Sequence, residues 1–377
     1  MKGSNKPMKN VLIVGPVPPP YGGIAAVVQE IVNSRLAEDY SFEIFDAQEG
    51  APSEFSLLKR LPFNVKRLLK FNLLILKKRF DFAHLHFDCG SFRGRALMIL
   101  SLRLRGIKVL LHLHGTGWEV FYDEVSESER LFARIGLRAS NIIIVLYSFW
   151  VRKLKELIPG SEVYVTNNFV GPGEPVPEPI ILEYRKKCGF EEDDIVVIFV
   201  GGLGWRKGCY DILEAIPALV AENEKMKFLF VGGDDYPGEF EKIKDQASEH
   251  GLDQNIYLTG QASREDVTVY MQMSQIFLLP TYREGAPIAI IEAMRASLPI
   301  ITTPVGGIPD MVTDGFNGLL IEPGHPEQIA QAVRRLVADP TLRRELGRAA
   351  NEVFEQKFSS SAAIGQLEKM YEKILSI

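Results

Sequence analysis

The chain has 377 residues, of which 46% are hydrophobic and 24% charged, and its formal net charge is −5. This length and balance predict a globular protein of two domains with a sizeable core. Three scattered cysteines, Cys89, Cys188 and Cys209, argue against a disulfide framework, and no apolar run approaches the ~20 residues of a membrane span. No secretory signal is evident, so we expect a cytoplasmic protein.

The first predicted strand, Val11 to Gly15, leads into a proline-rich loop that ends in Gly22 and Gly23. An amphipathic helix is predicted from Ile24 to Leu36. Two glycines at such a turn let the backbone approach a ligand closely. Their spacing is not that of a dinucleotide fingerprint, and a proline-stiffened loop without a ligand is the alternative.

Residues 55–108 are strongly basic, with thirteen basic residues, two acidic residues and a net charge of +11. Between Phe55 and Phe82, apolar and basic side chains alternate, which predicts one or two amphipathic helices, broken near Pro62. A solvated charged face is one interpretation. The other is that basic residues 59–108 rest on an anionic membrane at its inner face, at ~1 kcal/mol per basic residue. A nucleic-acid partner is not expected, because no binding motif or aromatic interleaving is present.

Two strand-like runs end in His-x-His, at residues 83–86 and 109–114. Strand alternation places His84 with His86, and His112 with His114, on common faces. Imidazoles suit zinc, so a metal site is one interpretation. No carboxylate pattern completes such a site, and we expect burial of His84 and His112 without a metal.

His114 differs from the other three histidines because it ends its strand. It is followed by Gly115-Thr116-Gly117, a loop whose backbone can meet a ligand. His114 is therefore a candidate site residue, and a buried structural histidine is the alternative.

Strands and helices continue to alternate up to residue 167, which predicts an open parallel sheet. Residues 171–179 then contain four prolines and two glycines, the best linker candidate in the chain. We predict an N-terminal domain of residues 1–170, a linker at 171–180 and a C-terminal domain of residues 181–359.

The second half opens with a predicted strand at 195–200 and the run G-G-L-G-W-R-K-G at 201–208, before a helix at 210–221. Backbone amides, a helix N-terminus and the cations of Arg206 and Lys207 converge there, which predicts a phosphate site. A glycine-rich turn with surface cations is the alternative.

The stretch from Tyr282 to Met294, Y-R-E-G-A-P-I-A-I-I-E-A-M, follows a predicted buried strand at 276–280. Gly285 allows a tight turn and Pro287 is tolerated in a first helical turn, so a helix is predicted from Ile288 to Arg295. A helix N-terminus at the carboxyl end of a strand is a ready anion site.

Glu284 and Glu292 in this stretch are about two helical turns apart, too far to share one ligand atom. Together they suit an extended polyhydroxy ligand. An ordinary strand-to-helix connection with two solvated glutamates is the alternative.

The motif at 284–292 has two glutamates separated by seven residues, with Gly-Ala-Pro after the first. This motif resembles the signature of retaining glycosyltransferases of the GT-B fold, in family 4 (glycosyl transferases group 1). The run at 201–208 resembles that family's diphosphate-binding loop, and the resemblance is strongest from Val196 to Glu322. It implies an α/β fold of two Rossmann-like, doubly wound parallel-sheet domains facing across a cleft. The C-terminal helix, 360–377, would pack back on the first domain.

The resemblance also implies roles for individual residues. His114, Glu284, Arg206 and Lys207 would be catalytic. The nucleobase would lie near Gly260, Gln261 and Ala262, with Val305 to Gly307 flanking the nucleotide. The implied donor-binding residues are Gly22, Gly23, Gly202, Arg206, Lys207, Glu284, Gly285, Ala286, Pro287, Ile288 and Glu292.

The implied activity is that of a retaining hexosyltransferase (EC 2.4) that moves a sugar from a UDP- or GDP-sugar to a cell-surface polysaccharide or lipid-linked glycan. Preorganised positive charge would stabilise the departing diphosphate, so no metal or other cofactor is expected. Three alternatives stay open: a metal-dependent hydrolase built on His84, His86, His112 and His114, a nucleotide-sugar 2-epimerase, and a non-catalytic nucleotide-sugar-binding partner. The Gly-Ala-Pro after Glu284 favours transfer.

Overall fold

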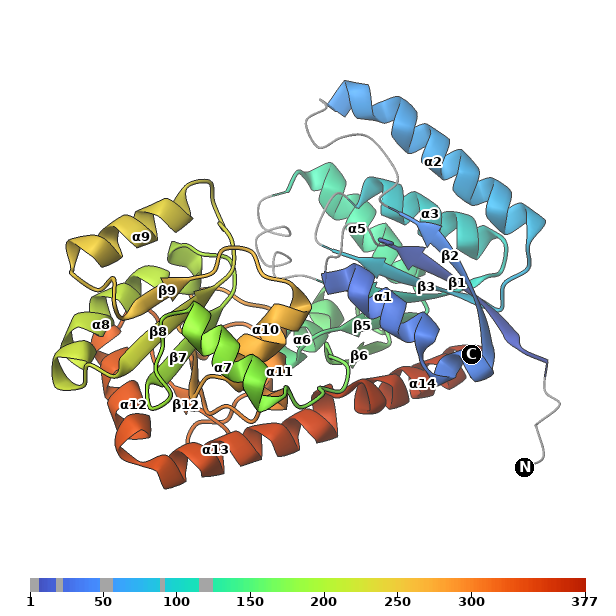
Figure 1. Ribbon diagram of the computed structural model, residues 1–377. Coiled ribbons are helices and arrows are strands. Elements are labelled where there is room, and N and C mark those ends of the chain that lie inside the picture. Colours follow the sequence, from blue (N-terminus) through green and yellow to red (C-terminus); the bar gives the residue numbers. More distant parts are fainter. Residues whose placement is uncertain (1–6, 18–22, 48–56, 89–91, 115–124) are drawn as a thin grey trace, which may run out of the picture. The chain divides into compact units, whose positions relative to one another are not determined.

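The computed structural model describes residues 7–17, 23–47, 57–88, 92–114 and 125–377, which form two compact units (Figure 1). Unit 1 contains the chain up to Asn168 together with Ser360–Ile377, and unit 2 is Phe169–Ser359. The chain thus enters unit 2 two residues before the predicted linker at 171–180 and leaves it at Ser359.

Unit 1 is built on a parallel six-stranded sheet in the order β2-β1-β3-β4-β5-β6. All six residues of β3 are buried, as expected for a parallel strand covered on both faces. The edge strand β2 was not predicted. The strands are β1 Lys9–Gly15, β2 Tyr40–Asp46, β3 Phe82–Phe87, β4 Lys108–Leu113, β5 Ile142–Val145 and β6 Val163–Val165.

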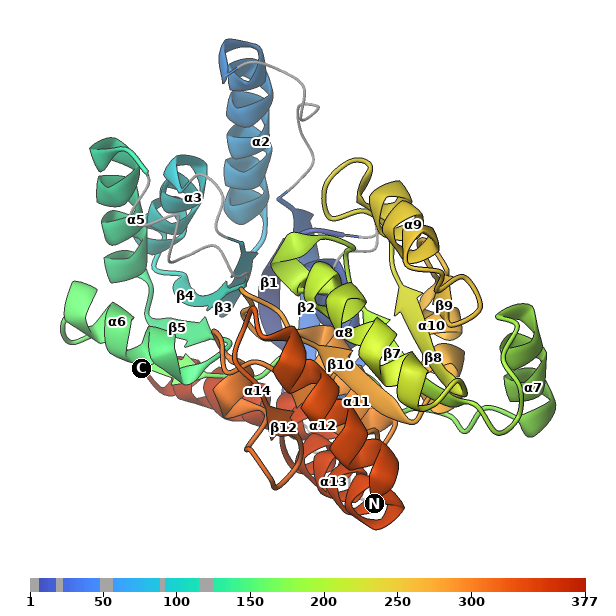
Figure 2. The same cartoon turned by 90° about the vertical axis from the view of Figure 1, so that its left-hand side faces the viewer.

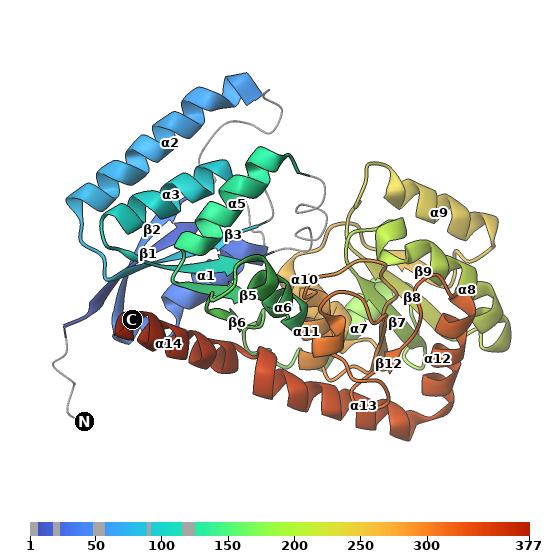
Figure 3. The same ribbon diagram turned by 180° about the vertical axis from the view of Figure 1, so that it is seen from behind.

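Helices cover both faces of this sheet (Figures 1 and 2). Buried side chains of α2, α3 and α5 share one hydrophobic core with Leu12, Leu85 and Leu111 of the sheet. The C-terminal helix α14 lies along the opposite face, where its Tyr371 reaches His84 of β3 (Figure 3). The helices of unit 1 are α1 Gly23–Asn33, the 3-10 turn Arg35–Glu38, α2 Leu57–Lys77, α3 Arg93–Leu104, α5 Glu127–Ala139, α6 Ser148–Leu157 and α14 Ser360–Ser376.

The predicted break near Pro62 is wrong, because α2 is one helix that contains Pro62. Proline removes one backbone hydrogen bond near the start of this helix. Phe71 and Ile75, which are 0% and 4% exposed, anchor its later turns in the core. Tertiary packing therefore outweighs the local cost of the proline.

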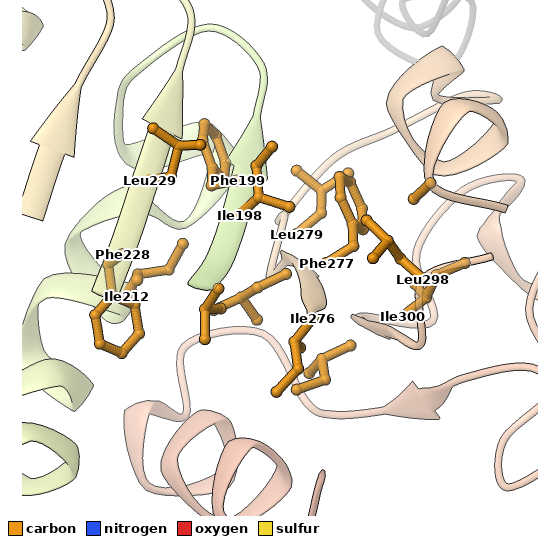
Figure 4. Close-up of a cluster of buried hydrophobic side chains, with 14 of the residues drawn as sticks. Ile198, Phe199, Ile212, Phe228, Leu229, Ile276, Phe277, Leu279, Leu298 and Ile300 are labelled. Atoms are coloured by element: carbon orange, nitrogen blue, oxygen red, sulfur yellow. The ribbon is translucent and has the colours of Figure 1, made fainter. Parts of the chain in front are cut away.

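Unit 2 has a second parallel six-stranded sheet, in the order β12-β11-β10-β7-β8-β9. Strand β7 reads I-V-V-I-F-V, and both faces of this sheet are packed with apolar side chains, as Figure 4 shows for Ile198, Phe228 and Phe277. The short edge strand β12 was not predicted. The strands are β7 Ile195–Val200, β8 Met226–Val231, β9 Ile256–Leu258, β10 Ile276–Leu279, β11 Ile300–Thr302 and β12 Leu319–Leu320.

Two helices of unit 2, α10 and α13, begin at side chains that satisfy their first backbone amides. Ser263 and Asp266 form a reciprocal capping box at α10, and Asp339 accepts hydrogen bonds from two amides of α13. The segments are α7 Glu178–Lys187, the 3-10 turn Trp205–Lys207, α8 Cys209–Glu222, α9 Glu239–Glu249, α10 Arg264–Gln272, α11 Ile288–Arg295, the 3-10 turn Ile308–Asp310, α12 Pro326–Ala338, α13 Pro340–Val353 and the π-turn Phe354–Phe358.

The proline-rich stretch at the start of unit 2 is held by specific hydrogen bonds. Gln272 binds it twice, accepting from the Val176 amide at 2.8 Å and donating to the Glu174 carbonyl at 2.9 Å. Arg295 donates to the Gly171 carbonyl at 3.3 Å. Residues 171–176 are therefore attached to unit 2 along their length. Across the described ranges, no helix is both long and apolar enough to cross a bilayer.

The docking of α14 predicts that its buried residues stabilise unit 1. Leu367 is 0% exposed, so Leu367→Ala should lower the free energy of unfolding by about 3 kcal/mol through lost burial and a residual cavity. Urea unfolding measures the loss, and hydrogen exchange should show faster exchange in β3 and β4 but not in β10. The exposed Lys369→Ala is the control and should change neither quantity. Unchanged exchange in β3 and β4 would contradict the packing of α14 on that sheet.

Candidate functional site

The loops at the carboxyl ends of β7, β8, β10 and β11 define the candidate site of unit 2. The chain leaves β7 for β8 on one side and later returns to β10 on the other side of β7. Such a reversal of strand order is where open parallel sheets bind ligands. The stretches 201–208 and 282–292, both predicted from sequence as ligand-binding, flank this point.

Gly208 brings the first of these loops against the second. Its φ is 78°, and a Cβ at this position would lie 2.1 Å from the Pro280 carbonyl oxygen. Only glycine fits both the left-handed backbone and this close approach. The amide of Tyr282 then donates to the Arg206 carbonyl at 2.9 Å, which fastens the loop after β10 to the cationic turn.

Arg206 is held by a bidentate ion pair with Asp235, in the loop after β8. Its Nε and Nη2 donate to the two Asp235 carboxylate oxygens at 2.9 and 2.7 Å. This hydrogen bonding raises the pKa of the Arg206 guanidinium above its usual value. Asp235 was missed as a site residue. The neighbouring Asp234 instead accepts hydrogen bonds from the amides of Gly238 and Phe240 at the start of α9.

Lys207 forms an ion pair with Glu284, joining the loops on either side of the strand reversal. The two side chains are 15% and 5% exposed, so solvent screens this pair weakly. The sequence indicated each residue separately, and the structure brings them together. Lys207 thus neutralises a carboxylate that would otherwise be buried and unpaired.

Gly306 ties the loop after β11 to the same place. Its φ is 58°, and a Cβ there would lie 1.6 Å from the Glu284 carbonyl oxygen. The next residue, Gly307, donates its amide to the Gly285 carbonyl at 2.8 Å. Residues of the stretch Val305 to Gly307 therefore hold the predicted turn at Gly285 in place.

Helix α11 begins at the predicted residue, Ile288, with Pro287 as its N-cap and no side chain capping it. Its first amides and its dipole therefore remain oriented toward the loop that contains Gly285 and Ala286. An anionic group of a ligand would accept hydrogen bonds from the first amides of this helix.

Glu292 is half-buried on α11, and within the described parts of the chain no hydrogen bond or ion pair holds its carboxylate. Burial raises the pKa of Glu292, against the opposing effect of the Arg295 and Arg264 charges. A half-buried carboxylate without a partner costs free energy, which is typical of a group kept for a ligand.

The weaker nucleobase candidates lie beside the loop after β8. The Gly232 amide donates to the Gly260 carbonyl at 3.1 Å, and Gln261 approaches Gly233. Ala262 packs against the core of unit 2. Gly260 and Gln261 are therefore at the same sheet edge as Arg206.

The four histidines of unit 1 share one face of its sheet and are 0–3% exposed. The His114 ring is hydrogen-bonded to His86 at 2.9 Å, and burial lowers the pKa of His84 and of His114 to about 3. Burial of His84 and His112 was expected. The burial of all four rings gives a substrate no access to them, which disfavours the hydrolase alternative. Gly22 and the loop Gly115 to Gly117 lie outside the described residues, and Gly23 begins α1.

Comparison with solved structures defines the fold class. The Anabaena protein HepE in complex with UDP has a TM-score of 0.74 to this chain at 16% identity, covering 97% of this chain and 100% of that one. Two parallel six-stranded α/β units that match over this length identify the GT-B fold, and the predicted fold class is confirmed.

Sequence comparison gives a family model and relatives to which the chain is similar. Residues 181–353 match the family model described as glycosyl transferases group 1. The chain is 24% identical over 330 residues to N-acetyl-alpha-D-glucosaminyl L-malate synthase of Bacillus anthracis, covering 87% of this chain and 84% of that one. It is 25% identical over 346 residues to the putative teichuronic acid biosynthesis glycosyltransferase TuaC of Bacillus subtilis, covering 88% and 82%. Unit 2 of the chain therefore matches the model of the glycosyl transferases group 1 family, and these two relatives span most of the chain.

The buried Lys207–Glu284 pair yields a stability prediction. Lys207→Met keeps most of the side-chain volume but leaves the Glu284 carboxylate unpaired, so it should lower the free energy of unfolding by about 3 kcal/mol. Urea unfolding at neutral pH measures it. The matched control is Lys225→Met, because Lys225 and Asp193 form an ion pair of side chains that are 49% and 60% exposed. That control should cost at most about 1 kcal/mol. Equal losses in the two variants would contradict a buried, structurally important pair in the site.

Proposed function

We propose that this protein is a retaining hexosyltransferase (EC 2.4, family 4) that transfers a sugar from a UDP- or GDP-sugar without a metal. The observation that carries the proposal is the meeting of Arg206, Lys207, the α11 N-terminus and Glu284 at the strand reversal of unit 2. A UDP donor is favoured by the similarity to HepE, whose crystal structure was solved in complex with UDP.

The diphosphate of the donor would bind Arg206 and Lys207 and the amides at the start of α11. Departure of the diphosphate from the anomeric carbon develops negative charge on its oxygens, and preorganised cations and dipoles stabilise that charge. These residues supply the stabilisation that a divalent ion supplies elsewhere, so the proposed reaction needs no metal.

The proposed chemical step is a front-face substitution. The bond between the anomeric carbon and the diphosphate oxygen breaks, and an acceptor hydroxyl attacks from the side that the diphosphate leaves. The acceptor proton passes to a phosphate oxygen of the leaving group. Neither Glu284, which is paired with Lys207, nor Glu292, which is further along α11, is arranged as the nucleophile of this step.

The two glutamates would read hydroxyl groups of the donor. Glu284 has a second carboxylate oxygen available for the transferred sugar, in addition to the one bound by Lys207. Glu292, half-buried and without a direct partner among the described residues, would accept hydrogen bonds from the ribose. His114, the catalytic residue that we propose for unit 1, would act through its backbone, because its ring is buried and hydrogen-bonded to His86.

We propose a cell-surface polysaccharide or a lipid-linked glycan as acceptor. The name of TuaC, a putative teichuronic acid biosynthesis glycosyltransferase, supports this acceptor class. The B. anthracis relative is named for a small acceptor, L-malate, so acceptor choice varies among relatives.

Nucleotide binding tests the donor site. UDP, GDP and ADP are compared by thermal shift, and the preferred nucleotide at 100 times its dissociation constant should stabilise the protein by ~2.7 kcal/mol. Arg206→Ala and Glu292→Gln should abolish or weaken the response. Arg334→Ala is the control, because Arg334 also pairs with a carboxylate, Glu222, but lies on α12 away from the site. Its response should equal that of the wild type.

The stability of the Glu292→Gln variant separates a role of Glu292 in nucleotide binding from a general loss of folding. Burial raises the pKa of Glu292, so ionisation of this carboxyl opposes folding. The stability contributed by the protonated carboxyl is complete below the unfolded pKa and is lost as pH rises through the folded pKa. Glu292→Gln should therefore be at least as stable as the wild type at pH 7 while binding the nucleotide less. No response of the wild type to any of the three nucleotides would contradict the donor site. Binding without sugar transfer to any acceptor would instead favour the non-catalytic alternative.

We also propose that α2 places unit 1 on an anionic membrane surface at the cytoplasmic face. Leu69, Leu73 and Leu76 recur on one face of this helix and are 61%, 53% and 63% exposed. Exposed lysines run beside them, at positions 66, 70 and 77. An apolar stripe bordered by cations is typical of helices that lie in a membrane interface, where buried apolar area and attraction to anionic lipids act together.

Vesicle flotation tests the membrane surface. The wild type should float with vesicles that contain phosphatidylglycerol more than with pure phosphatidylcholine, and added salt should weaken the binding. Replacing Leu69, Leu73 and Leu76 together by serine should abolish flotation. The control variant replaces three other exposed apolar residues by serine, Leu131 of α5 and Ile180 and Leu182 of α7. This variant should float as the wild type does. Equal, negligible binding to both vesicle types would contradict this surface and leave the transferase proposal intact.

A further inference from the structure

The histidine cluster of unit 1 is defined by His84, His86, His112 and His114. Strands β3 and β4 pair in parallel with His86 opposite His112. The rings therefore gather on one face, with centroids 4.1 Å apart for His84 and His86, 5.1 Å for His86 and His112, and 5.6 Å for His84 and His112. Helix α14 contributes to the wall of this cluster through Tyr371.

The hydrogen bonds of the cluster use one ring nitrogen each of His84, His86 and His114. Nδ1 of His84 is 2.9 Å from the Tyr371 hydroxyl, and Nδ1 of His86 is 2.9 Å from Nε2 of His114. Within the described residues, Nε2 of His84, Nε2 of His86 and both ring nitrogens of His112 are buried without a hydrogen-bond partner. Buried polar atoms are normally paired, so four unpaired nitrogens in one cluster require an explanation.

We propose that His84, His86 and His112 bind a divalent transition-metal ion of the zinc type. One ring nitrogen from each residue lies within 4.8 Å of those of the other two. A tetrahedral ion with Zn–N distances of about 2.0–2.1 Å needs its ligand atoms about 3.4 Å apart, which small ring rotations provide. Three imidazoles with water in the fourth position are a known ligand set for zinc.

Two features prepare the rings for this role. Metal-binding histidines usually donate the N–H of the other ring nitrogen to a fixed partner, and Tyr371 and His114 occupy those positions for His84 and His86. The ring of His112 has both nitrogens without a hydrogen-bond partner among the described residues, so either one can face the ion without losing a hydrogen bond.

The ion would act on the structure of unit 1 and take no part in sugar transfer. It would join β3 to β4, and through Tyr371 it would hold α14 on the sheet. This inference does not rest on the proposed function, because none of the three ligands belongs to the donor site.

Metal binding is tested on the full-length protein after removal of bound metal with a chelator. The wild type should take up one equivalent of Zn²⁺ in competition with a chromophoric chelator, and one equivalent of Co²⁺ should give the visible absorption of a tetrahedral site. Saturating Zn²⁺ should raise the unfolding temperature by about 5 °C or more.

His112→Phe is the decisive variant, because neither ring nitrogen of His112 makes a hydrogen bond that the substitution would remove. It should fold and lose the equivalent of metal. Tyr371→Phe should retain the site and weaken Zn²⁺ binding roughly 10–100-fold. The controls His250→Ala and His325→Ala alter exposed histidines and should bind as the wild type does.

Two results would overturn the proposal. One is a wild-type protein that takes up less than a stoichiometric amount of either ion. The other is equal uptake by the wild type and by His112→Phe, which would place the bound metal elsewhere on the chain. Should His112→Phe fail to fold, His112→Gln, which retains polarity without an imidazole, decides between the same outcomes.

Discussion

A buried carboxylate governs the candidate site of unit 2. Glu284 is 7% exposed, and a charge so removed from water is tolerated only with a partner, which is Lys207. Because the two residues follow β10 and β7, their pairing holds together the loops on either side of the strand reversal. Gly306 packs against the backbone of Glu284, so the loop after β11 depends on the same residue. The loops of the candidate site are thereby held in place by the protein itself, which is the preorganisation that electrostatic stabilisation of a leaving group requires.

The parts of this site that were predictable from sequence carry local signals. Helix α11 spans the predicted residues because Gly285 and Pro287 mark its start, and β7 is a continuous run of β-branched and aromatic residues. The pairing of Arg206 with Asp235 was not predictable, since 29 residues separate them and only the alignment of β7 with β8 brings them together. The edge strands β2 and β12 were missed for a related reason: their pairing, rather than their composition, defines them.

The histidines of unit 1 show the same division between local pattern and register. Alternation along each strand correctly predicted that His84 and His86 share a face. Whether that face also holds His112 depends on the parallel register of β3 and β4, which composition does not encode. The outcome is a polar cluster in a position where apolar side chains would pack at lower cost. Unit 2 pairs the buried Glu284 with Lys207, whereas the described part of unit 1 leaves ring nitrogens of the histidine cluster unpaired.

The pairing in unit 2 also determines how a diphosphate would be recognised. Arg206 and Lys207 are balanced by Asp235 and Glu284, so these four side chains carry no net charge. Nonspecific attraction of anions is therefore weak, and the uncompensated positive potential comes from the amides at the start of α11. Nη1 of Arg206 makes only a long contact of 3.4 Å with the Arg283 carbonyl. Asp235 already orients the Arg206 guanidinium, so a diphosphate bound at the start of α11 would contact a fixed group. This limits the entropy lost on binding. Because the cations are paired, the arrangement favours an anion of one geometry and gives only weak affinity for anions in general.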